Sequence, residues 1–386
     1  MKYYALVVVA TALVTLLLSW AVWRFGIRYR IYPAIRERDV HARPTPRLGG
    51  VAMYLGVVFA FVMSAQIPYF QIFWDRPERN WALLGATTLI VLVGVADDVW
   101  DLDWMVKLGA QFLAAGIVVG PGGFQIFALP IGTVVVVSSW LSFLVSVLAI
   151  VVVMNAINFI DGLDGLVAGV ALIANAVFFA YTYLLMRDYG FTSYANLAAF
   201  MAVVLLGVCL GFLPLNWNPA RMFMGDSGAL MIGLLMACSA LAVTGNLPQT
   251  MLTDNDVFGR SQLLGAFIPI LLPIVVVLLP LLDFGMAVIR RTMQGRSPFS
   301  ADRKHLHHRM LDMGHSDRDA VLIFYAWTAV ASLSVLMMYI GTRQDWPGGY
   351  WPGIAFFVVG ALACVVVTVI PARARSRSDT DERMPS

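Results

Sequence analysis

Long apolar runs recur along the whole of this chain, and they constrain its fold more than any other feature of the sequence. A helix that crosses a bilayer needs about 20 consecutive, mainly apolar residues. Charged residues make up 13% of the chain, whereas a soluble domain carries about 25%. The sequence therefore predicts an all-α polytopic membrane protein with about eleven transmembrane helices. The expected spans cover roughly residues 4–25, 48–67, 81–96, 105–120, 139–158, 163–186, 194–213, 227–245, 263–289, 319–341 and 351–371.

Two parts of the chain do not fit this pattern of spans. The run 124–138 is apolar but short, and proline and glycine interrupt it before a run of valines. That composition favours a small β-hairpin on the extracytoplasmic side. Residues 372–386 are polar and basic, and we expect them to form a disordered cytoplasmic tail. Residues 1–371 are then a single transmembrane domain whose polar loops face the cytoplasm.

Basic residues are distributed unevenly between alternate loops. With the spans given above, one side of the membrane carries 20 of the 26 lysines and arginines, and the other side carries 6. Lysine and arginine are enriched in cytoplasmic loops. The split therefore places the N-terminus outside the cell and the C-terminus in the cytoplasm.

Every polar cluster of unusual composition falls on the basic side. The clusters are far apart in sequence, and the alternation of the spans alone brings them to one membrane face. They occupy residues 41–50, 97–101, 155–165, 216–228 and 300–309. One cytoplasmic site assembled from five loops is the simplest interpretation.

The acidic clusters suit a divalent cation. Asp97 and Asp98 end the third expected span, and Asp226 precedes the eighth. Adjacent carboxylates repel one another unless a cation neutralises them, and hard oxygen ligands are typical of Mg²⁺ or Mn²⁺ sites. The helix that follows Asp226 also directs its N-terminus at the site, which favours phosphate. The alternatives without chemistry are a hydrated helix end and a helix cap.

The central cluster, Asn155–Gly165, separates two expected spans. Asn155 and Asn158 are three residues apart, so they share a helix face. Asp161 continues that spacing, and Asp164 adds a further step. Four polar side chains would then line one edge at the membrane surface. A capped turn between two spans would account for the aspartates but not for the asparagines.

Basic, amide and imidazole side chains supply the remaining candidates. The loop 300–309 suits a diphosphate better than a zinc ion, because the spacing typical of zinc hydrolases is absent. A solvated basic loop is the alternative. The substrate-binding candidates of this kind are Arg47, Lys107, Asn218, Arg221, Arg303, His305, His307 and His308.

Together, these clusters resemble the polyprenyl-phosphate N-acetylaminosugar-1-phosphate transferase family, the WecA/MraY type. The resemblance covers about residues 1–340. It rests on Pro44-Thr-Pro46 with Gly49-Gly50, Asp97-Asp98-Val-Trp-Asp101, Asn155–Gly165, Asn218–Asp226 and His305-Leu-His-His308. The last motif is similar to that of the WecA/TagO-like branch, the undecaprenyl-phosphate GlcNAc-1-phosphate transferases. Leu306 departs from the three consecutive histidines of the branch that uses a muramyl-pentapeptide nucleotide.

The resemblance implies a reaction at the inner (cytoplasmic) membrane, with the active site on the cytoplasmic face. UDP-N-acetylglucosamine and undecaprenyl phosphate, or another polyprenyl phosphate, would give polyprenyl-diphospho-N-acetylglucosamine and UMP. The cofactor would be Mg²⁺, with Mn²⁺ as the alternative ion. Residues 1–371 would form one transferase domain surrounded by membrane lipid. By family analogy we expect a homodimer, and no nucleic-acid partner is expected.

The resemblance also implies roles for individual residues. Asp226 would bind the metal ion together with Asp98. The catalytic carboxylates would be Asp97, Asp98 and Asp161, with Asp97 deprotonating the lipid phosphate. The nucleotide and its diphosphate would contact Asn155, Asn158, Asp161 and Asp164, and the histidines would contact the sugar and the diphosphate. Direct attack by the lipid phosphate and a covalent aspartyl intermediate both stay open.

Other functions are consistent with parts of the sequence. Within the family, the pentapeptide transferase is the nearest alternative, and no motif distinguishes N-acetylglucosamine from its 4-epimer. An ion-coupled transporter also carries intramembrane carboxylates, but it places them near the middle of the bilayer and uses repeated halves, which are not visible in this sequence. An intramembrane aspartyl protease would need glycine at position 223, where this chain has Phe223.

Overall fold

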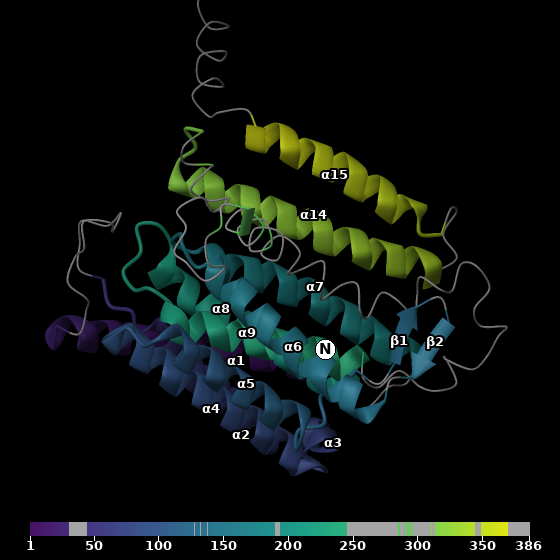
Figure 1. Ribbon diagram of the computed structural model, residues 1–386, viewed down its shortest axis with the longest axis horizontal. Helices are drawn as coiled ribbons and strands as arrows, with labels where there is room; N and C mark the ends of the chain where they lie inside the picture. Colours follow the sequence, from purple (N-terminus) through teal and green to yellow (C-terminus); the bar gives the residue numbers. More distant parts are fainter. Residues whose placement is uncertain are drawn as a thin grey trace, which may run out of the picture.

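The computed structural model is a bundle of long helices with one small β-hairpin (Figure 1). It describes residues 1–30, 45–126, 128–131, 133–136, 138–189, 194–244, 313–343 and 349–369, together with the single positions 285, 289, 292, 293, 295 and 310. Most of the span expected at 263–289 lies outside the described residues. The loop 300–309 and the tail 372–386 lie outside them entirely.

The helices follow the expected apolar segments closely. They are α1 (Lys2–Arg28), α2 (Gly49–Ala65), α3 (Gln71–Trp74), α4 (Pro77–Trp100), α5 (Trp104–Val119), α6 (Ser139–Phe159), α7 (Leu166–Tyr189), α8 (Tyr194–Asn216), α9 (Gly225–Thr244), α14 (Asp317–Arg343) and α15 (Trp351–Val369). A short 3₁₀ helix, Pro68–Phe70, leads into α3. Ten of the eleven expected spans therefore coincide with a described helix.

Not all of these helices are long and straight enough to cross a membrane alone. Within the described residues, eight helices are long and apolar enough to cross a membrane. The α2 helix forms a pair with residues 68–74 that is bent by 97°, and α5 is a shorter apolar helix. The structure thus confirms a helical architecture that is consistent with a multi-pass membrane protein, with one β-hairpin in addition. The total of eleven spans and the orientation stay predictions.

The strands lie where the sequence predicted a hairpin. Strand β1 (Ala128–Ile131) pairs antiparallel with β2 (Thr133–Val136), and Ala128 faces Val136 in the register. Both strands are within the expected range 124–138. In Figure 1 they lie at the end of the bundle away from the terminus of α1 at Arg28.

The centre of the bundle is α9. It is the most deeply buried of the candidate spans that the structure describes, and it packs against α2, α4, α6, α7 and α8. Helices α14 and α15 pair with each other, and α14 joins this core through α7 (Figure 1). A residue at the start of α9 is therefore held by several neighbouring helices.

Small residues allow the close helix packing that membrane proteins need. Helix α1 packs against α2 and α8. A Cβ atom at Gly56 of α2 would collide with Thr15, and one at Gly211 of α8 would collide with the backbone of Ala12. These glycines let three helix backbones approach one another.

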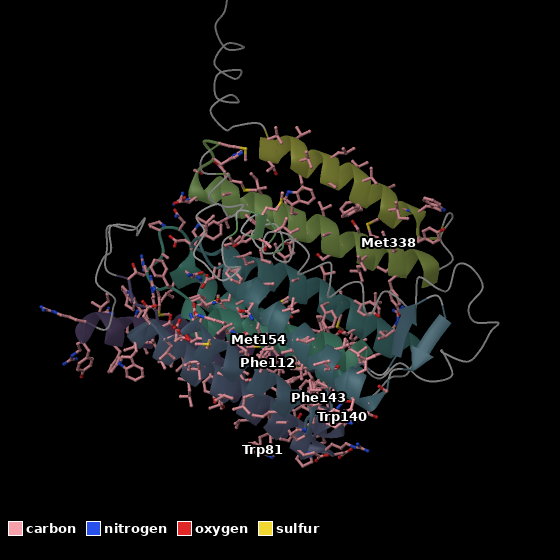
Figure 2. The ribbon with its side chains drawn as sticks, viewed as in Figure 1. Trp81, Phe112, Trp140, Phe143, Met154 and Met338 are labelled. Carbon is pink, nitrogen blue, oxygen red and sulfur yellow. The ribbon has the colours of Figure 1, made fainter. Side chains whose placement is uncertain are left out.

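Exposed tryptophans lie near both ends of the bundle, as expected at the two interfaces of a bilayer. Trp81 and Trp140 project from the surface (Figure 2) and are 65% and 85% exposed. Trp20 and Trp100 are also more than half exposed. They lie towards the C-terminal ends of α1 and α4, at the other end of the bundle from Trp81. We call the end that carries Trp100 and the start of α9 the carboxylate end.

The packing of α4 on α9 can be tested with two glycines of the same helix. A Cβ atom at Gly94 would collide with the backbone of Ser227, whereas one at Gly85 would meet nothing within 4 Å. We expect Gly94→Ala to lower the stability by about 1–3 kcal/mol, the usual cost of overpacking. Gly85→Ala is the matched control and should not lower the melting temperature in detergent. Equal melting temperatures for the two variants would contradict this packing.

Candidate active site

Backbone hydrogen bonds join two of the predicted clusters. The Phe223 N–H donates to the carbonyl oxygen of Pro46 at 2.9 Å. In return, the Gly49 and Gly50 N–H groups donate to the carbonyl oxygens of Phe223 and Met224 at 3.0 and 2.9 Å. The segment before α2 and the segment before α9 thus lie side by side. This pairing accounts for the glycines, because a Cβ atom at either position would collide with the segment from Phe223 onward.

Asp98 holds the start of α9. Its carboxylate accepts hydrogen bonds from the Asp226 N–H at 3.2 Å and from the Ser227 hydroxyl at 3.1 Å. The N-terminus of a helix has N–H groups without internal partners and favours a negative charge. Gly225 has a positive φ of 72° and lies against this carboxylate, where a Cβ atom would not fit. Asp98 therefore fixes Asp226 in position.

Lys107 joins two carboxylates from different helices. Its ammonium donates to Asp97 Oδ2 at 3.0 Å and to Asp226 Oδ2 at 3.3 Å. The turn after α4 brings it there: Asp101 adopts a left-handed conformation, and the Asp103 side chain caps α5 by accepting from a backbone N–H. Lys107 consequently lies near the start of α5, beside the last turn of α4.

The two asparagines of α6 have different partners. Asn158 donates to Asp226 Oδ1 at 3.0 Å. Asn155 donates to the side-chain oxygen of the buried Gln111 on α5. We expected the helical spacing of the two asparagines to continue through Asp161, but α6 ends at Phe159. That expectation was wrong, because the chain turns before Asp161 is reached.

Asp161 lies in the turn between α6 and α7 and is half-buried. Burial and the nearby carboxylates of Asp226 and Asp98 together raise the pKa of its carboxyl to about 8, and Arg47 opposes the shift. Arg47 is half-buried as well. The two residues thus belong to the same electrostatic environment as the carboxylates at the start of α9.

Asp164 anchors the loop before α9. Its Oδ2 accepts from the Ala220 N–H at 2.9 Å and from the Asn218 side chain at 3.3 Å. Asn218 in turn accepts from Arg318 of α14 at 3.3 Å. Asp164 is almost fully buried. These contacts give Asp164 and Asn218 a definite role in holding the loop.

Arg221 leaves this network. Its guanidinium lies over the ring of Trp23 on α1, with 5.9 Å between the Cζ atom and the ring centroid. Within the described part of the chain, its side chain makes no hydrogen bond or ion pair with the acidic cluster.

The structure thus unites four of the five predicted clusters at one end of the bundle. The directly connected residues are Asp97, Asp98, Lys107, Asn158 and Asp226, with Asp98 joined through the backbone N–H of Asp226. The candidates Arg303, His305, His307 and His308 lie outside the described residues. Sequence reasoning did not identify Gln111 or Arg318. The Lys107–Gln111 spacing of four residues on one helix face was the available signal for the first.

The acidic cluster suits Mg²⁺ with substrate present. No group of three or more histidine, cysteine, aspartate or glutamate side chains in the described ranges lies close enough to hold an ion by itself. Mg²⁺ usually takes only one or two carboxylates and completes its shell with phosphates and waters. Asp226 and the neighbouring Asp98 supply oxygen ligands of that kind at a helix N-terminus. The residues therefore fit an ion that is held jointly with a phosphate group.

Comparisons with known proteins agree with this geometry. The family model for glycosyl transferase family 4 matches residues 80–244, which include the whole of the connected cluster. The decaprenyl-phosphate N-acetylglucosaminephosphotransferase of Mycolicibacterium smegmatis is 37% identical over 99% of this chain and 92% of its own length. A probable undecaprenyl-phosphate N-acetylglucosaminyl 1-phosphate transferase of Bacillus subtilis is 30% identical over 86% and 84%. The undecaprenyl-phosphate alpha-N-acetylglucosaminyl 1-phosphate transferase of Escherichia coli is 28% identical over 85% and 82%.

The raised pKa of Asp161 predicts a pH-dependent stability. The folded protein holds a proton on Asp161 that the unfolded chain releases near pH 4, so this group makes stability fall as the pH rises from about 4 to about 8. Asp161→Asn removes the effect. In metal-free detergent solution, we expect its melting temperature to rise relative to the parent protein between pH 5 and pH 8.5. Asp75→Asn, which removes an exposed carboxylate at the other end of the bundle, should show no such rise. A constant difference for Asp161→Asn would refute the prediction.

Proposed function

The chain belongs to glycosyl transferase family 4, and from that membership we propose that it transfers N-acetylglucosamine-1-phosphate from UDP-N-acetylglucosamine to a polyprenyl phosphate. The products are polyprenyl-diphospho-N-acetylglucosamine and UMP. The observation that carries the proposal is the cluster of three carboxylates and one lysine at the end of a membrane bundle. A water-soluble nucleotide and a membrane-bound phosphate can both reach such a position.

The reaction exchanges one phosphoanhydride bond for another. An oxygen of the polyprenyl phosphate attacks the phosphorus that carries the sugar, and the bond from that phosphorus to the oxygen of UMP breaks. UMP leaves with the electron pair. A monoprotonated acceptor must also lose its proton, and Asp97 is our candidate to accept it. Its carboxylate lies in the last turn of α4 and accepts a hydrogen bond from Lys107 at Oδ2, at 3.0 Å.

Two anionic substrates have to approach each other among carboxylates, so positive charge is essential. A Mg²⁺ ion, when bound by Asp226 and Asp98, would neutralise the diphosphate and the leaving UMP. Lys107 supplies the second positive charge, and the amide of Asn158 orients the Asp226 carboxylate through its 3.0 Å hydrogen bond. Asp98 positions the start of α9 through its contact with Asp226.

We further propose that the protein resides in the inner (cytoplasmic) membrane with its carboxylate end in the cytoplasm. The uneven distribution of lysine and arginine supports this orientation. UDP-sugars are cytoplasmic metabolites in this scheme, so the donor reaches the site from that side. The expected homodimer stays a prediction.

The alternative functions are less favoured. The relatives are named for N-acetylglucosamine rather than for a muramyl-pentapeptide. A transporter would place its polar residues near the middle of the helices. Here Asp97 and Asp98 lie in the last turn of α4, and Asp226 is the second residue of α9.

The decisive assay measures UMP release from UDP-N-acetylglucosamine in the presence of a polyprenyl phosphate and Mg²⁺. Asp226→Asn removes a candidate metal ligand, so we expect turnover to fall at least about 100-fold. Asp75→Asn removes a carboxylate at the opposite end and should retain full turnover. Normal turnover by Asp226→Asn, or sugar uptake into vesicles without UMP release, would exclude the proposed function.

Lys107 and Mg²⁺ should compete for the same carboxylate oxygens. The ammonium occupies Oδ2 of both Asp97 and Asp226, where it repels a second cation. Lys107→Met should therefore lower the Mg²⁺ concentration at half-maximal binding by about tenfold, because two charges at this distance repel each other by a few kcal/mol. Turnover should nevertheless fall, because the catalytic cluster loses a positive charge. Mn²⁺ binding followed by electron paramagnetic resonance separates the two effects.

Lys2→Met, at the far end of α1, is the matched control and should change neither quantity. Weaker metal binding by Lys107→Met would instead show that the lysine supports the metal site.

A further inference from the structure

Two arginines from distant parts of the chain lie on one tryptophan. The Cζ atoms of Arg24 and Arg221 are each 5.9 Å from the ring centroid of Trp23. Arg24 also lies 5.0 Å from the ring of Trp20. Cations within about 6 Å of an indole face are attracted by the ring quadrupole. Both guanidinium groups thus share the Trp23 ring as a contact.

Neither guanidinium has an anionic partner in the part of the chain that the structure describes. The contacts found there for the Arg24 and Arg221 side chains are with tryptophan rings. Both arginines are exposed. Two positive charges that share one ring and have no counter-ion favour the approach of an anion, and planar guanidinium groups match phosphate oxygens in pairs.

The position of the pair along α1 corresponds to the level of lipid headgroups. Helix α1 has 27 residues and is about 40 Å long, whereas the hydrocarbon core of a bilayer is about 30 Å thick. Its first turn carries Tyr3, which stacks on Tyr69. From there to Trp23 is about 30 Å, so the two aromatic ends of α1 match the two interfaces. Figure 2 shows side-chain nitrogens gathered where α1 ends.

The surroundings of the pair are suited to lipid. Trp20 and Phe25 are each 51% exposed, and Ile27 is 44% exposed. Aromatic side chains with basic neighbours are typical of the interfacial region of a membrane protein. A nucleotide would instead meet an exposed apolar surface here. The combination of unpaired arginines and exposed apolar side chains therefore favours a phospholipid over a soluble phosphate.

We propose that Trp23, Arg24 and Arg221 form a binding site for the phosphate of an anionic membrane phospholipid. The site is separate from the carboxylate cluster and does not depend on the proposed transferase function. It assigns Arg221 to the membrane surface, in place of the nucleotide contact expected from the sequence. Because Arg221 belongs to the loop before α9, the bound lipid also holds this loop against α1.

The test measures binding of phosphatidylglycerol to the full-length protein in detergent, with phosphatidylcholine as the zwitterionic reference. Arg24→Gln and Arg221→Gln should each weaken phosphatidylglycerol binding by about tenfold or more, the usual size of a hydrogen bond to a charged group. Arg28→Gln removes an exposed arginine of the same helix end that does not lie on Trp23. It is the matched control and should change binding less than about twofold, since its contribution is general attraction.

Substitution of the Trp23 ring distinguishes a specific phospholipid site from general electrostatic attraction between lipid and protein. Trp23→Leu keeps every charge but removes the platform, so it should weaken binding as strongly as Arg24→Gln. Trp23→Phe retains a smaller ring and should weaken it less, and a melting curve for each variant verifies folding. Equal losses for all three arginine variants, with none for Trp23→Leu, would overturn the proposal.

Competition identifies the source of the phosphate. We expect neither UDP-N-acetylglucosamine nor an equimolar polyprenyl phosphate to displace phosphatidylglycerol, and Arg24→Gln should keep the KM of both substrates. Displacement by either substrate, with a matching rise of its KM in Arg24→Gln, would assign the arginines to that substrate and overturn the phospholipid site. This result would leave the transferase function intact, whereas absence of UMP release would leave the lipid-binding result intact.

Discussion

The contact between the Asp98 carboxylate and the first turn of α9 determines how the rest of the site is arranged. The free N–H groups of a helix start need acceptors, and an acceptor with negative charge also complements the helix dipole. Since α9 is the most buried candidate span in the described part of the bundle, its start is fixed relative to several helices. Asp226 is the second residue of α9, so the same contact defines where that carboxylate lies.

Lys107 makes this concentration of carboxylates tolerable. Asp97, Asp98 and Asp226 come within reach of one another at a membrane boundary, where unpaired charges are costly. The lysine neutralises part of that charge through two ion pairs, and the amide of Asn158 satisfies another carboxylate oxygen. One ammonium does not balance three carboxylates. The remaining negative charge is the physical reason for proposing a divalent cation at this cluster. Burial raises the pKa of Asp161, and the carboxylates of Asp226 and Asp98 add to that shift.

Much of the fold follows from the sequence, because long apolar runs and the alternation of membrane sides are properties of single segments. That alternation correctly brought Asp97, Asn158 and Asp226 to one end. The individual pairings were not accessible in the same way. Spacing alone suggested that Asn155 and Asn158 act together, yet one faces α5 and the other α9, since the partner depends on which helix packs at each level. The anchoring of Asn218 by Arg318 joins residues 100 positions apart, and no local pattern indicates such a contact.

The loop before α9 connects the membrane surface to the carboxylate cluster. Asp164 holds it from one side through the Ala220 N–H, and Met222 accepts a hydrogen bond from Asn216 at its carbonyl. Between these contacts, Arg221 extends to Trp23 on α1. Only three residues lie between Arg221 and Gly225, where α9 begins. If a phospholipid occupies the arginine pair, the ordering of this short segment depends on the headgroups around α1. The position of Asp226 then responds to the charge of the membrane as well as to the packing of the bundle.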